Sequence, residues 1–125
     1  MSDKYTYRMQ PASTRGRRFS DHDAENTLDE IVHVQGEGFR NCGGSGVDEG
    51  RWLRHYRGVM GEKGIIYDCS VGGCQKVATD GGHVLFDERS GVFLLPICHK
   101  HNDPRRSNYY HCVAEYAVKL YNESG

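Results

Sequence analysis

Apolar residues recur with helical spacing in one segment of the chain and alternate with polar residues in another. The segment 48–60, DEGRWLRHYRGVM, carries apolar side chains at Trp52, Leu53, Tyr56, Val59 and Met60. Spacings of three and four residues predict an amphipathic helix, and Asp48 suits its N-cap. The stretch IVHVQ at 31–35 alternates instead, which predicts a strand.

Two further apolar runs predict a β-hairpin. Residues 83–86 and 92–97 are rich in branched and aromatic side chains, and the turn-forming stretch Asp87–Gly91 separates them. Upstream of the hairpin, IIYDC at 65–69 predicts another strand that leads into a turn.

The segment that follows the hairpin predicts a second helix. Asp103 is a suitable N-cap, and Pro104 is a favoured first helical residue. Apolar side chains then follow i, i+3, i+4 spacing at Tyr109, Cys112, Val113, Tyr116, Ala117 and Leu120. We therefore expect an amphipathic C-terminal helix that packs on the hairpin.

The remaining segments are polar or rich in glycine. Residues 1–20 read as a flexible basic arm, and residues 21–125 as a single domain. Within that domain, DHDAENTLDE at 21–30 is acidic and favours a short helix, and 36–50 reads as a glycine-rich loop.

Composition indicates a small core that needs extra stabilisation. Hydrophobic residues make up 37% of the 125 residues and 16 are glycine, so a staple such as a metal is expected. The net charge of −1 excludes a global basic field for nucleic acid, and any such contact would be a local patch. With no apolar run long enough to span a membrane and no signal-peptide core at the N-terminus, we expect a cytoplasmic protein. Five cysteines with seven histidines in a reducing compartment favour metal over disulfides.

Four of these residues form two pairs with the spacing of a zinc site. Cys69 and Cys74 flank SVGG, a glycine-containing loop, and Cys98 lies three residues before His101. Thiolates with one imidazole, closed to four ligands, are typical of structural Zn²⁺. The alternative is that these are ordinary buried cysteines, which explains Cys42 and Cys112 better. His83, in the hairpin, competes with His101 as fourth ligand.

The order of these motifs resembles the treble-clef core of the HNH nuclease superfamily. A cysteine pair, then GGHV at 81–84, a hairpin, and LLPICHKHN at 94–102 match small HNH-like zinc proteins with a GAHV…PLCxxHN pattern. An upstream CGSWLxHW segment of that family is similar to Cys42-Gly43 followed by RWLRHY at 51–56. The resemblance covers roughly residues 31–103. It implies a small α+β treble-clef domain with a hairpin and flanking helices.

The resemblance also implies possible catalytic residues. His83 matches the general base of active HNH enzymes, and Asn102 matches the metal ligand after the second cysteine pair. The acid that usually precedes the base is replaced by Gly82, with Asp80 two residues further back, and the asparagine that orients the base is replaced by Phe93. A phenylalanine cannot hydrogen-bond the base, and one asparagine cannot hold a catalytic Mg²⁺. The sequence thus indicates a degenerate site.

Two functions are consistent with these residues and motifs. The first is a zinc-stabilised binding module without catalysis, whose partner is a protein or a nucleic acid. For a nucleic acid, the contacts expected are the arginines Arg15, Arg17, Arg18, Arg51, Arg54 and Arg57, with Lys100, Arg105 and Arg106. The second is a metal-dependent HNH-type endonuclease, with His83 as general base and with Asn102 and Asp80 around a Mg²⁺ ion. A thiol redox enzyme is a weak third hypothesis, because the chain has no Cys-x-x-Cys pair.

Overall fold

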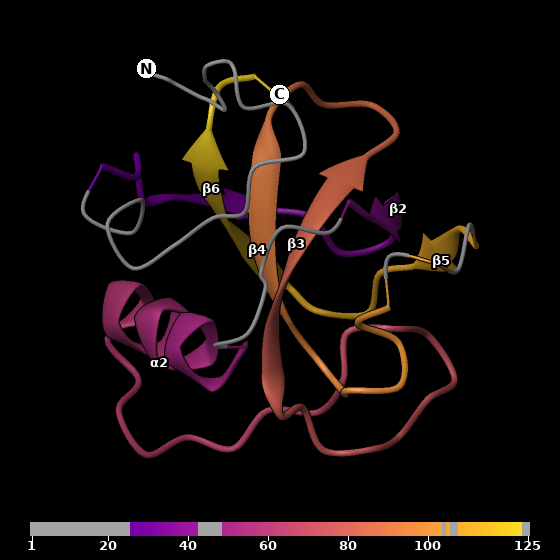
Figure 1. Cartoon of the computed structure of the whole chain (residues 1–125), viewed down its shortest axis with the longest axis horizontal. Helices are drawn as coiled ribbons and strands as arrows, with labels where there is room; N and C mark the ends of the chain where they lie inside the picture. The colour runs from indigo at the N-terminus through magenta and orange to yellow at the C-terminus, as the bar shows by residue number, and fades with distance from the viewer. Residues whose placement is uncertain (1–25, 43–48, 104, 106–107, 124–125) are drawn as a thin grey trace.

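A computed structural model describes residues 26–42, 49–103, 105 and 108–123 as an α+β fold (Figure 1). Six strands form one antiparallel sheet in the order β1-β6-β4-β3-β2-β5. Their bounds are β1 (Glu30–His33), β2 (Gly38–Asn41), β3 (Asp80–Phe86), β4 (Val92–Ile97), β5 (Tyr110–His111) and β6 (Tyr116–Tyr121), and the helix in the described residues is α2 (Glu49–Met60). The α+β class is as expected, with one described helix in place of several.

The sheet has two differently packed faces because successive strand residues point to opposite sides. In β4, Phe93, Leu95 and Ile97 belong to a buried cluster that includes Cys69 and Cys98, and we call this side the cysteine face. Leu94 points the other way, into a second cluster built around α2, which we call the helix face. Every residue of β4 is buried, as expected for the central strand of a sheet covered on both sides.

Helix α2 lies against β3 and β4 on the helix face (Figure 1). The predicted apolar stripe is confirmed: Trp52 and Tyr56 are buried with Leu94, Val118 and Leu120. The Tyr56 hydroxyl donates a hydrogen bond to the carbonyl of Tyr116 at 2.7 Å. This polar anchor fixes the helix across β6, the strand that lies between β1 and β4.

The predicted hairpin is present, and its first strand begins three residues earlier than expected. In β3 and β4, Asp80 pairs with Ile97 and His83 with Leu94. The predicted strand at 31–35 corresponds to β1, which pairs with β6. Residues 26–29 are not helical, and the other half of the expected acidic helix, 21–25, lies outside the described residues together with the arm at 1–20.

The predicted C-terminal helix is wrong. Residues 110–111 form β5, and residues 116–121 form β6 in the middle of the sheet. Tyr109 and Val113, expected on the buried helix face, are 64% and 45% exposed. The segment YAVKLY suits a strand because aromatic and β-branched side chains pack well on a pleated surface, and pairing with two strands outweighs the helical spacing.

Two other local predictions also fail for identifiable reasons. Residues 65–69 form no strand and make only an isolated bridge between Asp68 and Val77. The glycine-rich segment 36–50 contains strand β2, whose Phe39 is buried in the core, besides the start of α2. Asp103 does accept a hydrogen bond from the backbone N–H of Arg105 at 3.0 Å, as an N-cap side chain would, but no helix follows in the described residues 105 and 108–123.

No helix in the described residues is both long and apolar enough to cross a membrane.

The glycine pair at the start of β3 permits close approach on both faces. A Cβ on Gly81 would lie 2.5 Å from the backbone carbon of Trp52, so α2 rests directly on the strand backbone. A Cβ on Gly82 would lie 2.7 Å from Ile97 Cδ1 and 3.0 Å from Asn102 Oδ1 on the opposite side. Glycine at both positions therefore sets the spacing of the helix and of the turn around Asn102.

We predict that Gly81→Ala destabilises the protein by about 3 kcal/mol, because the added methyl group overlaps helix backbone that cannot move aside like a side chain. Urea denaturation measures this change. Gly58→Ala is the matched control: Gly58 lies in α2, its Cβ would meet nothing within 4 Å, and the variant should gain up to about 1 kcal/mol. Equal effects of the two substitutions would contradict the packing argument.

Candidate metal centre

The first pair of cysteines lies on a tight loop before β3. The N–H of Cys69 donates to the carbonyl of Lys76 at 2.7 Å, and the N–H of Cys74 donates to the carbonyl of Val71 at 3.1 Å. Gly73 adopts φ +83°, a left-handed conformation that glycine accepts without strain. These bonds close the loop and turn both sulfur atoms to the same side. We call residues 69–74 the cysteine loop.

The second pair lies on the turn that follows β4. Cys98 is the residue after the strand, and its carbonyl accepts hydrogen bonds from the N–H of His101 at 3.2 Å and of Asn102 at 3.1 Å. This helical turn returns the His101 side chain toward the Cys98 sulfur. We call residues 98–102 the ligand turn.

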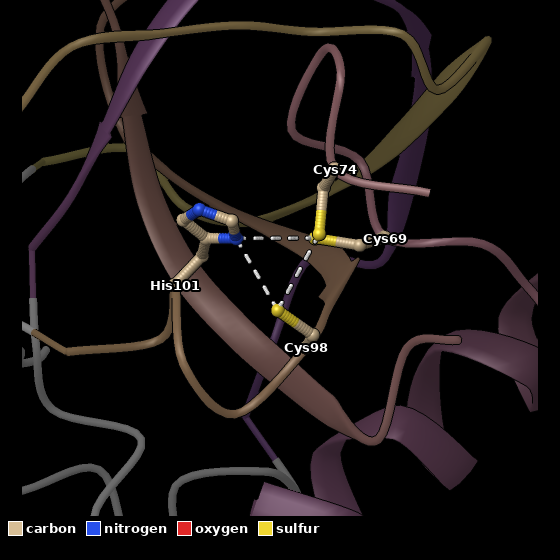
Figure 2. Close-up of side chains that lie close together, drawn as sticks. All are labelled: Cys69, Cys74, Cys98 and His101. Carbon is tan, nitrogen blue, oxygen red and sulfur yellow. Dashed lines mark hydrogen bonds between the residues drawn. The ribbon is translucent and has the colours of Figure 1, made fainter. Parts of the chain in front are cut away.

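The four predicted ligand residues lie close together, as the sequence predicts (Figure 2): Cys69, Cys74, Cys98 and His101. Their four ligand atoms all lie within 4.8 Å of one another. Cys74 Sγ is 3.8 Å from Cys98 Sγ, and His101 Nδ1 is 3.2 Å from Cys98 Sγ and 3.9 Å from Cys69 Sγ. Tetrahedral Zn²⁺ with its usual bond lengths would separate two sulfurs by about 3.8 Å and sulfur from nitrogen by about 3.6 Å. The group can therefore hold a metal ion.

Burial and hydrogen bonding shift the pKa values of two of these thiols in opposite directions. Burial raises the pKa of Cys69 to about 12, because a thiolate there would lose its hydration. The backbone N–H of Lys76 lowers the pKa of Cys74. A bound cation would supply the positive charge that the buried thiolates otherwise lack.

The other two cysteines lie outside this group. Cys112 is fully buried, its Sγ lies 3.5 Å from the carbonyl oxygen of Ala114, and its backbone bridges to Val71 in the cysteine loop. Burial raises the pKa of Cys42 to about 12 and that of Cys112 to about 11. The interpretation of both as non-ligands agrees with the structure, although Cys112 lies on an extended segment and not on a helix.

A second polar cluster lies beside the metal centre, on the same face of the sheet. Asp80 is 5% exposed, and its Oδ2 lies 3.0 Å from His99 Nδ1 and accepts a hydrogen bond from Asn102 Nδ2 at 3.1 Å. Asn41 Nδ2 donates to Asn102 Oδ1 at 2.6 Å. The predicted candidate Asn102 is thus held by a carboxylate and an amide.

His83 lies on the opposite face of β3. Its side chain is completely buried, with the ring edge-on to Trp52 at 4.6 Å between centroids. Burial lowers the pKa of His83 to about 3, so the ring is neutral at physiological pH. Alternation along the strand places Asp80 and Gly82 on the cysteine face and His83 on the helix face. His83 is therefore neither in the metal centre nor beside Asn102.

The described arginines differ in their surroundings. Arg51 and Arg54 are exposed on α2, whereas Arg57 donates to the carbonyl of Ile65 at 2.7 Å and lies over the Tyr67 ring. Lys100, in the ligand turn, and Arg105, shortly after it, are exposed. The three arginines expected in the arm, Arg15, Arg17 and Arg18, lie outside the described residues, as does Arg106.

Comparison with known proteins gives no match to the chain among family models, curated proteins or solved structures. The resemblance to HNH proteins therefore depends on the sequence motifs alone.

The sequence pattern does not reveal His99 and Asn41 as parts of a site. His99 adjoins the zinc-ligand candidate Cys98, and that adjacency turns its ring away from the metal centre and toward Asp80. Asn41 ends β2, and only the pairing of β2 with β3 brings it near. The sequence feature that marks this polar cluster is Asp80, a carboxylate immediately before the glycine pair Gly81-Gly82.

We predict that His83 makes the folded state sensitive to acid. Its pKa lies below the value of 6.5 for an unfolded chain, so the unfolded state binds the proton first, and stability falls as pH drops below 6.5. Between pH 7 and pH 5 this contribution is about 2 kcal/mol.

The measurement is the free energy of unfolding at both pH values for the wild type and for His83→Leu. The leucine variant should lose about 2 kcal/mol less than the wild type over this range. His111→Ala, which removes an exposed histidine, is the control and should behave as the wild type does. An equal loss in the wild type and in His83→Leu would refute the assignment.

Proposed function

We propose that the group of Cys69, Cys74, Cys98 and His101 holds a structural Zn²⁺ ion. The observation that carries this proposal is the convergence of three sulfurs and one imidazole nitrogen within 4.8 Å. Thiolates and imidazole suit zinc better than they suit Mg²⁺ or Ca²⁺, which prefer oxygen. Four protein ligands fill a tetrahedral shell, so no position remains for a substrate, which is typical of a structural and not a catalytic zinc.

The proposed zinc would join the cysteine loop directly to the ligand turn. The cysteine loop meets the rest of the chain through short backbone contacts, such as Ser70 N–H to the carbonyl of Pro96 at 2.9 Å. Apparent zinc binding in small finger peptides supplies about 10–16 kcal/mol at neutral pH. Because only 37% of its residues are hydrophobic, the chain has a small core, and zinc binding would add to the free energy that stabilises the fold.

The loop, hairpin and ligand turn support a treble-clef arrangement as part of this proposal. A treble clef would continue into a helix after the turn, and here β5 and β6 follow among the described residues. The proposed core is therefore the metal-bound hairpin, with a C-terminal continuation of a different kind.

We further infer that the protein acts as a binding module for a macromolecule in the cytoplasm. Arg51 and Arg54 present two exposed guanidinium groups on one side of α2, which favours a phosphate backbone as the ligand. A protein partner is the alternative, supported by Ile66, which is 73% exposed, and by Val77. The cytoplasm is part of this proposal because cysteine ligands stay reduced in a reducing compartment.

The endonuclease alternative receives less support from the geometry. Its mechanism needs the base His83 and the ligand Asn102 to converge on one phosphate. His83 packs on Trp52 at the helix face, whereas Asn102 contacts Asp80 at the cysteine face. A β-strand backbone thus separates the two groups that the reaction would need together.

We predict about one zinc per chain in protein purified without added metal, measured by native mass spectrometry. Cys74→Ala should lose the zinc, because it removes one of four ligands. Cys112→Ala removes a buried cysteine outside the group and should keep it. Metal-free protein, or equal zinc content in the two variants, would contradict the proposal.

We predict that Arg54→Glu weakens binding to a short DNA or RNA duplex and reduces the salt slope of the binding constant by roughly 0.9 for the lost phosphate contact. Fluorescence anisotropy at several salt concentrations measures both. Arg40→Glu makes the same charge change on β2 and should leave binding almost unchanged. If the wild type binds neither nucleic acid at low salt, the nucleic-acid proposal is refuted.

A further inference from the structure

The chain that leads from α2 to the cysteine loop forms half of a narrow two-stranded ribbon. Residues 66–69 run antiparallel to residues 76–79, with an isolated bridge between Asp68 and Val77. Two backbone hydrogen bonds, of 2.7 and 2.8 Å, flank this bridge. We call these two segments the outer ribbon. In Figure 1 the chain between α2 and β3 runs along the lower border of the molecule.

The outer edge of residues 66–68 has backbone groups that the described fold does not use. In an antiparallel ladder, a residue pair that exchanges no hydrogen bond directs its N–H and C=O groups outward. These groups of Asp68, and those of Ile66 two residues earlier, therefore face away from residues 76–79. No hydrogen bond between described residues uses them. A strand added along this edge would complete the strand that the sequence IIYDC predicts.

The same edge presents exposed aliphatic side chains. Ile66 is 73% exposed and Val77 is 53% exposed, whereas the intervening Tyr67 is half-buried and Ala78 is buried. This alternation places Ile66, Asp68 and Val77 on the outward side of the ribbon. Ile66 and Val77 are diagonal neighbours across the two segments, so they form one apolar surface and not two scattered residues.

Contacts with α2 and the residues just after it hold the outer ribbon in place. Arg57 Nε donates to the carbonyl of Ile65 at 2.7 Å, and the Tyr67 hydroxyl donates to Glu62 Oε1 at 2.6 Å. The Tyr67 ring also packs edge-on to Tyr56, with 5.1 Å between centroids. A partner would therefore meet an edge that is already ordered, which reduces the conformational entropy lost on binding.

We propose that the edge of residues 66–68 binds an extended segment of a partner protein by strand addition. The segment would hydrogen-bond the outward backbone groups, cover Ile66 and Val77 with aliphatic side chains, and place a lysine or arginine against Asp68. The proposal rests on the protein alternative of the binding-module proposal, and it assigns that partner to a surface apart from the exposed arginines of α2.

Charge favours this occupant over a nucleic acid or a second copy of the chain. Asp68 is exposed, and its carboxylate has no hydrogen bond or ion pair within the described residues. The outward positions 66, 68, 77 and 79 contain this one carboxylate and no cation. A phosphate would be repelled here, and the same edge of a second copy would bring no cation. A segment with a basic residue supplies the missing charge.

Selection from a displayed library of random peptides, about ten residues long, tests the proposal. Enriched peptides should carry alternating aliphatic residues and a lysine or arginine. Ile66→Asp should weaken their binding at least about tenfold, because it removes the most exposed apolar contact. Ile31→Asp makes the same change at an isoleucine on β1 that is 46% exposed, and it should leave binding unchanged. Asp68→Lys should shift the selection from basic to acidic residues.

Hydrogen exchange distinguishes strand addition from contact through side chains alone. An enriched peptide should slow exchange of the Ile66 and Asp68 amides at least about tenfold, because both become hydrogen-bonded. The same peptide with N-methylated amides keeps its side chains but loses its donors, and it should bind at least about tenfold more weakly. Binding without protection of these two amides would overturn the proposal.

The remaining outcomes are equally decisive. Absence of enriched peptides, or equal binding by Ile66→Asp and Ile31→Asp, would overturn the proposal. A dimer that Ile66→Asp dissociates would overturn it in favour of a second copy of the chain, and loss of duplex binding in Ile66→Asp would overturn it in favour of a nucleic acid. Failed peptide selection with a wild type that still binds the duplex would refute this edge alone and leave the nucleic-acid proposal standing.

Discussion

The closure of the ligand turn onto the cysteine loop is the constraint on which the rest of the structure depends. The hydrogen bonds from His101 and Asn102 to the carbonyl of Cys98 bend the chain immediately after β4. That bend brings a sulfur and an imidazole to the loop that precedes β3. The chain just before β3 is thereby held against the chain just after β4, at the open end of the hairpin where Asp80 pairs with Ile97.

Alternation along β3 then distributes chemistry between the two faces of the sheet. Gly81 and His83 belong to the side where α2 packs, and Asp80 and Gly82 belong to the side of the cysteines. Asp80 and His83, which the family resemblance assigns to one catalytic site, therefore lie on opposite faces of β3. The glycines have steric reasons to be there, and His83 serves as a buried neutral ring against Trp52.

The parts of the fold that could be predicted are those set by local pattern. The helix at 49–60, the hairpin and the four clustered ligands each have a signal within a few residues: apolar spacing, a glycine turn, and paired cysteine and histidine positions. The C-terminal segment could not be predicted in this way. Its residues have helical spacing and also suit a strand. The segment forms a strand because it pairs with β1 and β4, which are distant in the sequence. In the cluster around Asp80, the family resemblance drew attention to Asp80 and Asn102 but not to His99 or Asn41, because the direction of His99 follows from the pitch of the turn and the position of Asn41 follows from strand pairing.

The position of β6 between β1 and β4 has a consequence for the order in which the protein can assemble. Strand β1 is made early, but its partner in the sheet is β6, with Glu30 opposite Lys119. During synthesis, therefore, β1 has no strand to pair with until almost the whole described chain has left the ribosome. Pairings between such distant segments form slowly because the chain must first close a large loop. The early strand must remain soluble meanwhile, and the polar residues Glu30 and His33 at its ends reduce its tendency to pair with other chains.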